Sequence, residues 1–405
     1  MQKYAGVIHC FFVNAMLTVL LFSLLSGTAF AASSAPAVMG NDCPVVLVHG
    51  FMGWGREEMG GYLYWGGFYD IEKMIAEQGF KTVTASVGPI SSVHDRACEL
   101  FWQLKGGRVD YGAEHAKKFG HKRFGRKYKS KLPEWSENKP VHMIGHSMGG
   151  QTIRYLAELL ARDYFKQGTN ERWILSVTTI STPHNGTTLA TIVSRIFWNM
   201  AEELLVGLNA LANGSVEMIY DFDLQHWGIM RKSNESLRAH LQRIISTVGD
   251  TQDISSYDLA PEGAGKLNEM IRVFPDIYYL SYSNTSTFNA PIIGISLSRR
   301  LTVNPVLYLP ADFMGTYSGE AIPADKHRIW RQNDGIVNTV SMLGPSNAKI
   351  VKRIPEKSLK KGVWTDMGLT YNTDHLQIVG HYVLDDKWLK EFYAGVVDNL
   401  KKMKR

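Results

Sequence analysis

The sequence contains only three cysteines among 405 residues, and charged residues make up no more than 20% of it. Cys10, Cys43 and Cys98 cannot form a disulfide framework, although Cys43 and Cys98 can be either one pair or two buried thiols. The net charge of +6 is mild for this length and does not by itself indicate nucleic-acid binding. The chain also lacks internal repeats and low-complexity linkers, which favours a single large domain.

Only one long apolar run is present, and it stands at the N-terminus. Lys3 precedes the apolar core Met16 to Leu25, and Ala29 and Ala31 are small residues at the two positions that a signal peptidase reads. We therefore expect residues 1–31 to be a secretion signal cleaved after Ala31, so that the protein is secreted. The alternative is an uncleaved membrane anchor, because residues 7–30 are long enough to span a bilayer.

The mature chain is then expected to have two parts. Residues 32–41 are rich in small residues and are expected to form a flexible leader. Residues 42–405 would form the single domain.

One short motif organises the rest of that domain. Gly145-His146-Ser147-Met148-Gly149 follows the apolar segment 141–144 and precedes the amphipathic segment 151–162. Gly-x-Ser-x-Gly between a strand and a helix is typical of the nucleophile elbow of the α/β-hydrolases, in which glycines permit a sharp turn with the serine at its apex. We expect Ser147 to be a nucleophile and the Met148 backbone N–H to be an oxyanion-hole donor. An accidental turn is the alternative.

A second loop is expected to complete the oxyanion hole. The apolar strand 44–48 ends in His49-Gly50-Phe51-Met52-Gly53. In α/β-hydrolases the loop after the corresponding strand supplies the second oxyanion N–H, and we assign it to Phe51. The alternative is a plain strand and turn whose phenylalanine fills the core.

A serine hydroxyl is a poor nucleophile until a base takes its proton. The α/β-hydrolase fold supplies that base late in the chain, in the order Ser, Asp, His, and this sequence offers Ser147, Asp334 and His375 in that order. His375 would accept the serine proton, and Asp334 would orient the imidazole and stabilise its cation. Asp374 and Asp366 are competitors for the role of the acid.

Apolar patterning predicts an α/β fold with a mostly parallel central sheet. The helical spacing of apolar residues in 187–212 indicates either a core helix or a helical lid over the site, expected at about 187–225. Residues 88–131 are polar and predicted to be irregular, and their basic run is either a solvated face or a contact to an anionic lipid or envelope surface. Strands are expected at 44–48, 81–87, 141–144, 173–179 and 277–282, and helices at 70–78, 151–162, 234–245 and 386–400.

Several stretches of the sequence resemble the staphylococcal lipases and the thermostable lipases of Bacillus and Geobacillus. Residues 145–152 resemble the first group, and residues 49–59 are similar to the second. The resemblance covers most of residues 42–393 and implies a secreted triacylglycerol lipase that acts on a lipid ester at an oil–water or membrane interface, with Ser147, Asp334 and His375 as its triad. Further matches lie at 95–99, 110–113, 333–341, 360–364 and 374–375.

The resemblance also implies a structural zinc ion, held within an insertion at about 88–131. Its ligands map onto Asp95, His115, His121 and Asp253. Two aspartates would neutralise the charge of the metal, and two imidazoles would complete a tetrahedron that leaves no position open for catalysis.

A calcium site is expected to be lost or much weakened. The thermostable relatives bind calcium with carboxylates two residues after the catalytic histidine and five residues further on. This chain has Gln377 and Tyr382 at those positions, and a hard cation needs anionic oxygen ligands. Asp385 and Asp386 could restore the site only through a local rearrangement.

Two other functions stay open. A phospholipase or a general carboxylesterase of the same fold is the close alternative, and a catalytically silent surface-binding protein is the distant one. The basic run is accompanied by no nucleic-acid-binding motif, and no obligate protein partner is evident.

Overall fold

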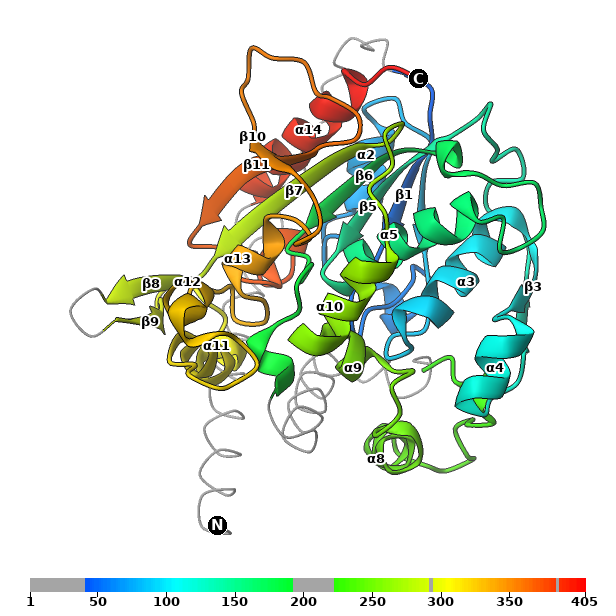
Figure 1. Ribbon diagram of the computed structural model, residues 1–405, viewed down its shortest axis with the longest axis horizontal. Coiled ribbons are helices and arrows are strands. Elements are labelled where there is room, and N and C mark those ends of the chain that lie inside the picture. The colour runs from blue at the N-terminus through cyan, green and yellow to red at the C-terminus, as the bar shows by residue number, and fades with distance from the viewer. Residues whose placement is uncertain (1–40, 192–221, 291–293, 384–385) are drawn as a thin grey trace.

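The computed structural model of the protein describes residues 41–191, 222–290, 294–383 and 386–405 (Figure 1). The predicted signal 1–31 and most of the predicted lid lie outside the described residues. Of the predicted leader 32–41, only Asn41 is among the described residues. Its side chain donates a hydrogen bond of 2.7 Å to the carbonyl of Leu400. In the described part of the chain, no helix is both long enough and apolar enough to cross a bilayer.

A seven-stranded sheet forms the centre of the molecule, and every pair of neighbouring strands in it is parallel (Figure 1). The predicted α/β fold with a mostly parallel sheet is therefore confirmed. Every residue of three inner strands, 45–48, 141–146 and 174–180, is buried because both faces of the sheet are covered. The strand order is β10 (Ile350–Lys352), β11 (Trp364–Tyr371), β7 (Tyr278–Thr285), β6 (Ile174–Ile180), β5 (Val141–His146), β1 (Val45–Val48) and β2 (Thr82–Ala85).

Helices cover both faces of this sheet. Successive residues of a strand point to opposite faces, so Val45 and Leu47 pack into one apolar core, and Val46 and Val48 pack into another. The first core contains residues of α2 and α14, and the second contains residues of α3 and α5. These helices are α2 (Ile71–Ala76), α3 (Val93–Lys105), α5 (Met148–Ala161) and α14 (Asp386–Lys401).

The segment 88–131 is ordered, and its prediction as irregular was wrong. It contains α3, which Ser92 caps by accepting a hydrogen bond from the Asp95 N–H, and a two-stranded antiparallel sheet. The buried side of α3 also carries Asp95, Arg96, Glu99 and Gln103, so the segment reads as polar although Val93, Ala97, Leu100 and Leu104 recur at helical spacing. The sheet pairs β3 (Gly107–Asp110) with β4 (Phe124–Tyr128), and α4 (Ala113–Phe119) lies between them in the chain.

The other elements lie around the sheet. The 3₁₀ turns that matter for the site are η3 (Thr188–Thr191), η4 (Gln225–Trp227) and η7 (Gln377–Val379). The antiparallel pair β8 and β9 projects at the left of Figure 1, on the opposite side from β3. The remaining helices and strands around the sheet are α8 (Leu237–Val248), α9 (Ser255–Leu259), α10 (Pro261–Met270), β8 (Thr287–Ala290), β9 (Ile295–Ser298), α11 (Tyr308–Gly315), α12 (His327–Trp330) and α13 (Thr339–Met342).

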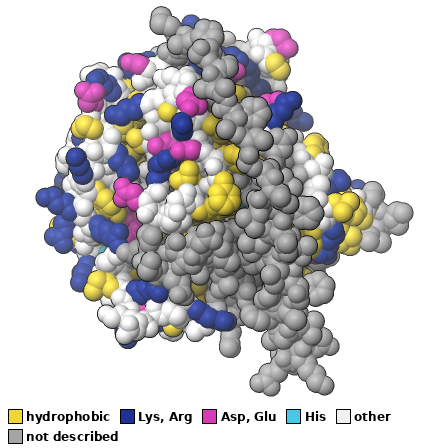
Figure 2. Space-filling model, turned by 180° about the vertical axis from the view of Figure 1, so that it is seen from behind, with side chains coloured by type: hydrophobic (Ala, Val, Ile, Leu, Met, Phe, Trp, Pro, Cys, Tyr) yellow, Lys and Arg dark blue, Asp and Glu magenta, His cyan; other side chains and the backbone are white. Residues whose placement is uncertain are grey.

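Two alternatives left open by the sequence concern the cysteines and the basic run. Cys43 and Cys98 are both buried free thiols, so they do not pair. Two arginines of the run form ion pairs, Arg123 with Asp110 and Arg126 with Asp223. Several of its lysines are exposed, and lysine and arginine side chains are widely spread over the face seen in Figure 2. A solvated basic face therefore accounts for the run, and contact with an anionic surface stays a prediction.

Candidate functional site

Ser147 occupies a strained turn between β5 and α5. Its backbone has φ 55° and ψ −130°, a conformation that costs a residue with a side chain roughly 1–3 kcal/mol. A Cβ atom on Gly145 would lie 2.5 Å from the backbone of Gly149, and one on Gly149 would lie 2.2 Å from the Val48 carbonyl oxygen. The two glycines of the motif are therefore needed for the helix to approach the sheet this closely.

The loop after β1 passes directly over this turn. A Cβ atom on Gly50 would lie 2.6 Å from the Cβ of Ser147, so only glycine permits the approach. The fully buried guanidinium of Arg96 donates hydrogen bonds to the carbonyls of His49 and Gly88, at 2.5 and 2.8 Å. Arg96 thus fixes the backbone of the loop that precedes Phe51, while Met148 is the first residue of α5.

Tyr64 connects that loop to the serine turn. Its hydroxyl accepts a hydrogen bond of 2.9 Å from the Gly50 N–H and lies 2.6 Å from Nδ1 of His146. Burial, and after it the neighbouring His375, hold the pKa of His146 well below its usual value. The neutral His146 can therefore accept a hydrogen bond from the Tyr64 hydroxyl through Nδ1. Local sequence patterns assign no role to Tyr64 or Arg96, because both act through contacts with distant residues.

Asp334 and His375 form a buried pair. Nδ1 of His375 lies 2.7 Å from Oδ2 of Asp334, and the His375 N–H donates to the Asp334 carbonyl at 3.0 Å. The other carboxylate oxygen of Asp334 accepts hydrogen bonds from the N–H groups of Ile336 and Val337. Both oxygens of this carboxylate are thus occupied, and the imidazole has one defined orientation.

The two competing aspartates do not take this place. Asp374 accepts backbone hydrogen bonds at both of its oxygens, from Leu376 and Gln377 at one and from Asn304 at the other. Asp366 accepts a hydrogen bond from the Gly368 N–H. Among the hydrogen bonds of the described residues, only Asp334 contributes a carboxylate to the His375 ring.

The His375 ring lies beside the serine turn. Its centroid is 4.6 Å from that of His146, the residue that precedes Ser147. Ser147 is 5% exposed and the side chain of His375 is 6% exposed, so both are nearly closed to solvent. Within the described part of the chain, no hydrogen bond joins the Ser147 hydroxyl to the imidazole.

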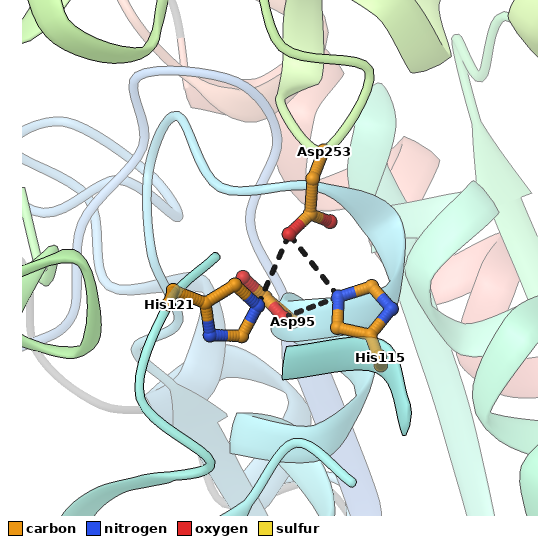
Figure 3. Close-up of side chains that lie close together, drawn as sticks. All are labelled: Asp95, His115, His121 and Asp253. Carbon is orange, nitrogen blue, oxygen red and sulfur yellow. Dashed lines mark hydrogen bonds and ion pairs between the residues drawn. The ribbon is translucent and has the colours of Figure 1, made fainter. Parts of the chain in front are cut away.

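The four predicted metal ligands converge on one point, and their facing ligand atoms all lie within 4.8 Å of one another (Figure 3). Nε2 of His115 is 3.1 Å from Oδ2 of Asp253 and 3.3 Å from Oδ1 of Asp95. Nε2 of His121 is 3.3 Å from the same oxygen of Asp253. Asp95 comes from α3, His115 from α4, and the other two from loops, so only the fold brings them together.

The electrostatics of this group fit a cation. Oδ1 of Asp95 and Nε2 of His121 are buried and make no hydrogen bond, which is rare for buried polar atoms. Burial alone would lower the pKa of His115, but Asp253 and Asp95 outweigh it and raise that pKa to about 9. The group can hold a metal ion: its two carboxylates would balance the charge of a divalent one, and its two neutral imidazoles would complete the coordination.

His226 supports this group and was missed by the sequence analysis. Its Nε2 lies 2.9 Å from Oδ2 of Asp95, the carboxylate oxygen that does not face His115. The ring packs against Tyr111 at a tilt of 33°, with centroids 4.4 Å apart. His226 sits in η4, and its carbonyl accepts a hydrogen bond from the Lys122 N–H. The contact between His226 and Asp95 therefore orients the Asp95 carboxylate, so that its other oxygen faces the remaining ligands.

The described residues on either side of 192–221 are held at different sites. Before it, the Thr187 hydroxyl donates to the Ile336 carbonyl at 2.7 Å, and the Thr188 N–H donates to the Asn338 side chain at 2.8 Å. After it, η4 contacts the metal-ligand group through His226. Residues 187 and 188 are therefore anchored beside Asp334, and His226 is anchored beside Asp95.

The comparisons with known proteins agree with this geometry. The family described as "Lipase-like, C-terminal domain" matches residues 41–405. The chain belongs to this family. It is 34% identical to a lipase of Staphylococcus hyicus over 391 residues, which are 90% of this chain and 58% of that protein. It is 35% identical to lipase 2 of Staphylococcus aureus over 386 residues, 89% of this chain and 54% of that protein. The chain thus spans little more than half the length of these curated relatives.

Solved structures of the family share its fold. EstA from Clostridium botulinum superimposes with a TM-score of 0.83 at 35% identity, covering 97% of this chain and 98% of that one. Lipase 1 from Pelosinus fermentans gives 0.78 at 36%, covering 91% and 100%. The Staphylococcus hyicus lipase gives 0.74 at 34%, covering 91% and 98%. The resemblance to staphylococcal lipases and the predicted α/β-hydrolase fold are confirmed.

Proposed function

We propose that the protein is a secreted lipase that hydrolyses carboxylic ester bonds of acylglycerols through a serine acyl-enzyme. Ser147 is the nucleophile, His375 the general base and acid, and Asp334 the residue that orients the imidazole. The observation that carries the proposal is the buried contact of 2.7 Å between Asp334 and His375, next to a serine on a strained strand-to-helix turn. The lipases among its relatives support the choice of substrate class.

The reaction begins when the Ser147 hydroxyl turns toward Nε2 of His375. The imidazole takes the proton as Oγ attacks the ester carbonyl, and Asp334 stabilises the resulting imidazolium. The N–H groups of Phe51 and Met148 donate to the oxyanion, which is worth about 3–4 kcal/mol per donor in such sites. His375 then protonates the leaving alcohol, and water releases the acid by the same steps.

The test uses the whole protein and two serine variants. Ser147→Ala is expected to abolish hydrolysis of a soluble short-chain ester while the melting temperature stays high, because the hydroxyl carries no structural contact. Ser136→Ala is the control, since Ser136 lies in a turn before β5, whereas Ser147 follows the opposite end of that strand. Ester hydrolysis by Ser147→Ala at the rate of the unchanged protein would end the proposal.

The substrate class is decided by the rates of hydrolysis of a triglyceride emulsion, a soluble short-chain ester and phospholipid vesicles at equal ester concentration. A triglyceride emulsion hydrolysed faster than soluble short-chain esters supports a lipase. Preference for soluble esters would make the protein a general carboxylesterase, and preference for phospholipid vesicles would make it a phospholipase. The lid at about 187–225 stays a prediction, since residues 192–221 lie outside the described part of the chain.

The proposal includes a structural zinc ion held by Asp95, His115, His121 and Asp253. Two buried atoms without hydrogen bonds, Oδ1 of Asp95 and Nε2 of His121, support it. When bound, zinc would cross-link α3, α4 and the loop at Asp253, and four protein ligands would leave it no open position for catalysis. Elemental analysis of the purified protein should find one zinc per chain, and another metal or none would refute this part.

Secretion forms the last part of the proposal. Protein recovered from the culture medium is expected to begin at Ala32, because residues 29–31 fit a signal peptidase. A chain that stays with the membrane and retains its first residues would replace the cleaved signal with an anchor.

A further inference from the structure

The residues after His375 form a compact turn that Asp374 stabilises. Oδ1 of Asp374 accepts hydrogen bonds from the N–H groups of Leu376 and Gln377, at 2.9 and 2.8 Å. Its Oδ2 accepts a third hydrogen bond, of 2.8 Å, from the N–H of Asn304 in a different segment. The fully buried carboxylate therefore joins two stretches of backbone that lie 70 residues apart.

Gln377 makes a second connection between the same two segments. Its Oε1 accepts a hydrogen bond of 3.0 Å from the Asp374 N–H, and its Nε2 donates one of 2.9 Å to the carbonyl of Thr302. Both ends of one amide are thus used. Asp374 and Gln377 together form what we call the 374–377 clasp, which attaches the turn bearing His375 to residues 302–304.

The segment at 302–304 is itself tied to the acid of the pair. The Thr302 N–H donates to the Arg299 carbonyl, the Arg299 N–H to the Ser286 carbonyl, and the Ser286 N–H to the Asn333 carbonyl, at 2.9 to 3.0 Å. Asn333 immediately precedes Asp334 in the chain. The clasp therefore closes a ring of hydrogen bonds around the contact between His375 and Asp334, and restrains both partners at once.

The groups at this place do not fit a calcium ion. Calcium takes six to eight oxygen ligands, several of them carboxylates. Here the Gln377 amide directs an N–H group at the Thr302 carbonyl, where a cation would need an oxygen. Position 382 is a tyrosine whose phenol lies against Asn304. Asp386, which could have restored a ligand, forms an ion pair with Lys390.

We propose that the 374–377 clasp positions His375 by direct hydrogen bonds and makes its placement independent of calcium. Gln377 acts as a positioning residue, since it touches neither substrate nor the reacting atoms. This positioning role of Gln377 rests on the function proposed above. The restraint itself does not, because thermal stability and amide exchange report it in a protein without any ester substrate.

The test replaces Gln377 by glutamate, which has the same shape but lacks the N–H donor. Gln377→Glu removes the N–H donor and sets a carboxylate oxygen against the Thr302 carbonyl oxygen, so two acceptors repel where a hydrogen bond stood. The matched control is Gln78→Glu, which makes the same charge change on a half-buried glutamine in the turn just after α2. Melting temperature, amide exchange of the peptide 374–381, and kcat and KM on a soluble ester are measured for each.

Gln377→Glu is expected to lower the melting temperature by a few degrees and to speed exchange in 374–381. We expect kcat to fall roughly tenfold with KM nearly unchanged, because a slightly misplaced base affects the chemical step more than binding. Gln78→Glu should change none of these. Identical exchange and kcat in Gln377→Glu and the unchanged protein would overturn the proposal.

The second arm adds millimolar calcium to the unchanged protein. A ligand that binds only the folded state raises its melting temperature, so no shift is expected here. A rise of several degrees, with calcium bound in a calorimetric titration, would overturn the proposal. If the protein proved to have no esterase activity, the melting and exchange results would still decide whether the clasp holds the turn.

Discussion

The protein contains two clusters built from the same residue types, and they differ in how their polar atoms are satisfied. In the pair Asp334 and His375, every carboxylate oxygen has a protein donor. In the group around Asp95, one carboxylate oxygen and Nε2 of His121 are buried without a hydrogen bond. A satisfied carboxylate orients one imidazole for proton transfer, whereas unsatisfied atoms that converge on one point suit a cation.

The two clusters are also expected to affect different properties, the first the rate of reaction and the second the stability of the fold. The pair lies beside a serine on a strained turn, so a change in it should abolish turnover and leave the fold intact. The group around Asp95 joins α3, α4 and the loop at Asp253, and among the described residues none of its four side chains forms a hydrogen bond with Ser147. A change in that group should weaken the fold and leave the chemical step nearly intact.

The largest expected effect comes from Asp334→Asn. An amide in place of this carboxylate favours the wrong imidazole tautomer, which lowers kcat by about 10⁴-fold in serine hydrolases. We expect such a loss on a soluble ester, with a small change in melting temperature. Asp325→Asn, on an exposed 3₁₀ turn, is the control. A loss of less than tenfold in Asp334→Asn would remove the distinction between the two clusters.

The second effect comes from Asp253→Asn in the other cluster. Loss of one anionic ligand should reduce the bound metal well below one ion per chain and lower the melting temperature by several degrees. At temperatures where the variant stays folded, kcat should remain within about threefold, because the ion has no role in the reaction. The neighbouring Asp250→Asn is exposed and should keep its metal. An unchanged metal content in Asp253→Asn would contradict the ligand assignment.

A smaller effect is expected from Tyr64→Phe. The change leaves the Gly50 N–H and Nδ1 of His146 without their shared partner, at a cost of about 1–3 kcal/mol. Because that N–H precedes the one assigned to Phe51, we expect kcat to fall about tenfold with little change in KM. Tyr371→Phe, on an exposed side chain, is the matched control. Equal kcat in the two variants would show that Tyr64 does not align the oxyanion loop.

The smallest effect concerns the pH dependence of the metal-depleted protein. The pKa of His115 is raised from 6.5 to about 9, so its protonation stabilises the fold. That contribution is complete below pH 6.5 and is lost as the pH rises through 9. Thermal melts should therefore show the depleted protein losing stability over this range. A flat profile would contradict the ion pairing of His115 with Asp253 and Asp95.

The sequence predicted the parts of this molecule whose signals are local. The strands at 44–48 and 141–144 were recognised because apolar runs end in glycine-rich turns, and Ser147 because its motif is contiguous. Asp334 and His375 came from their order along the chain, and the structure places them in contact. The four metal-ligand candidates came from the resemblance, and the structure brings them within 4.8 Å.

What the sequence could not give depends on contacts between distant residues. Helix α3 was missed because its buried side carries Asp95, Arg96 and Glu99, which only the fold satisfies. His226 lies 131 residues from Asp95, so no spacing rule connects them. Gln377 was noted only as a missing carboxylate, and its hydrogen bond to Thr302 became visible in three dimensions.

The central claim is that His375, held by Asp334, activates the hydroxyl of Ser147. Labelling with a fluorophosphonate probe tests it most directly, because the probe reacts with activated serines and needs no lipid substrate. Peptide mass spectrometry should find one modification per chain, on Ser147, and His375→Ala should slow the labelling by orders of magnitude. Labelling of another serine, or equal rates in His375→Ala and the unchanged protein, would contradict the account.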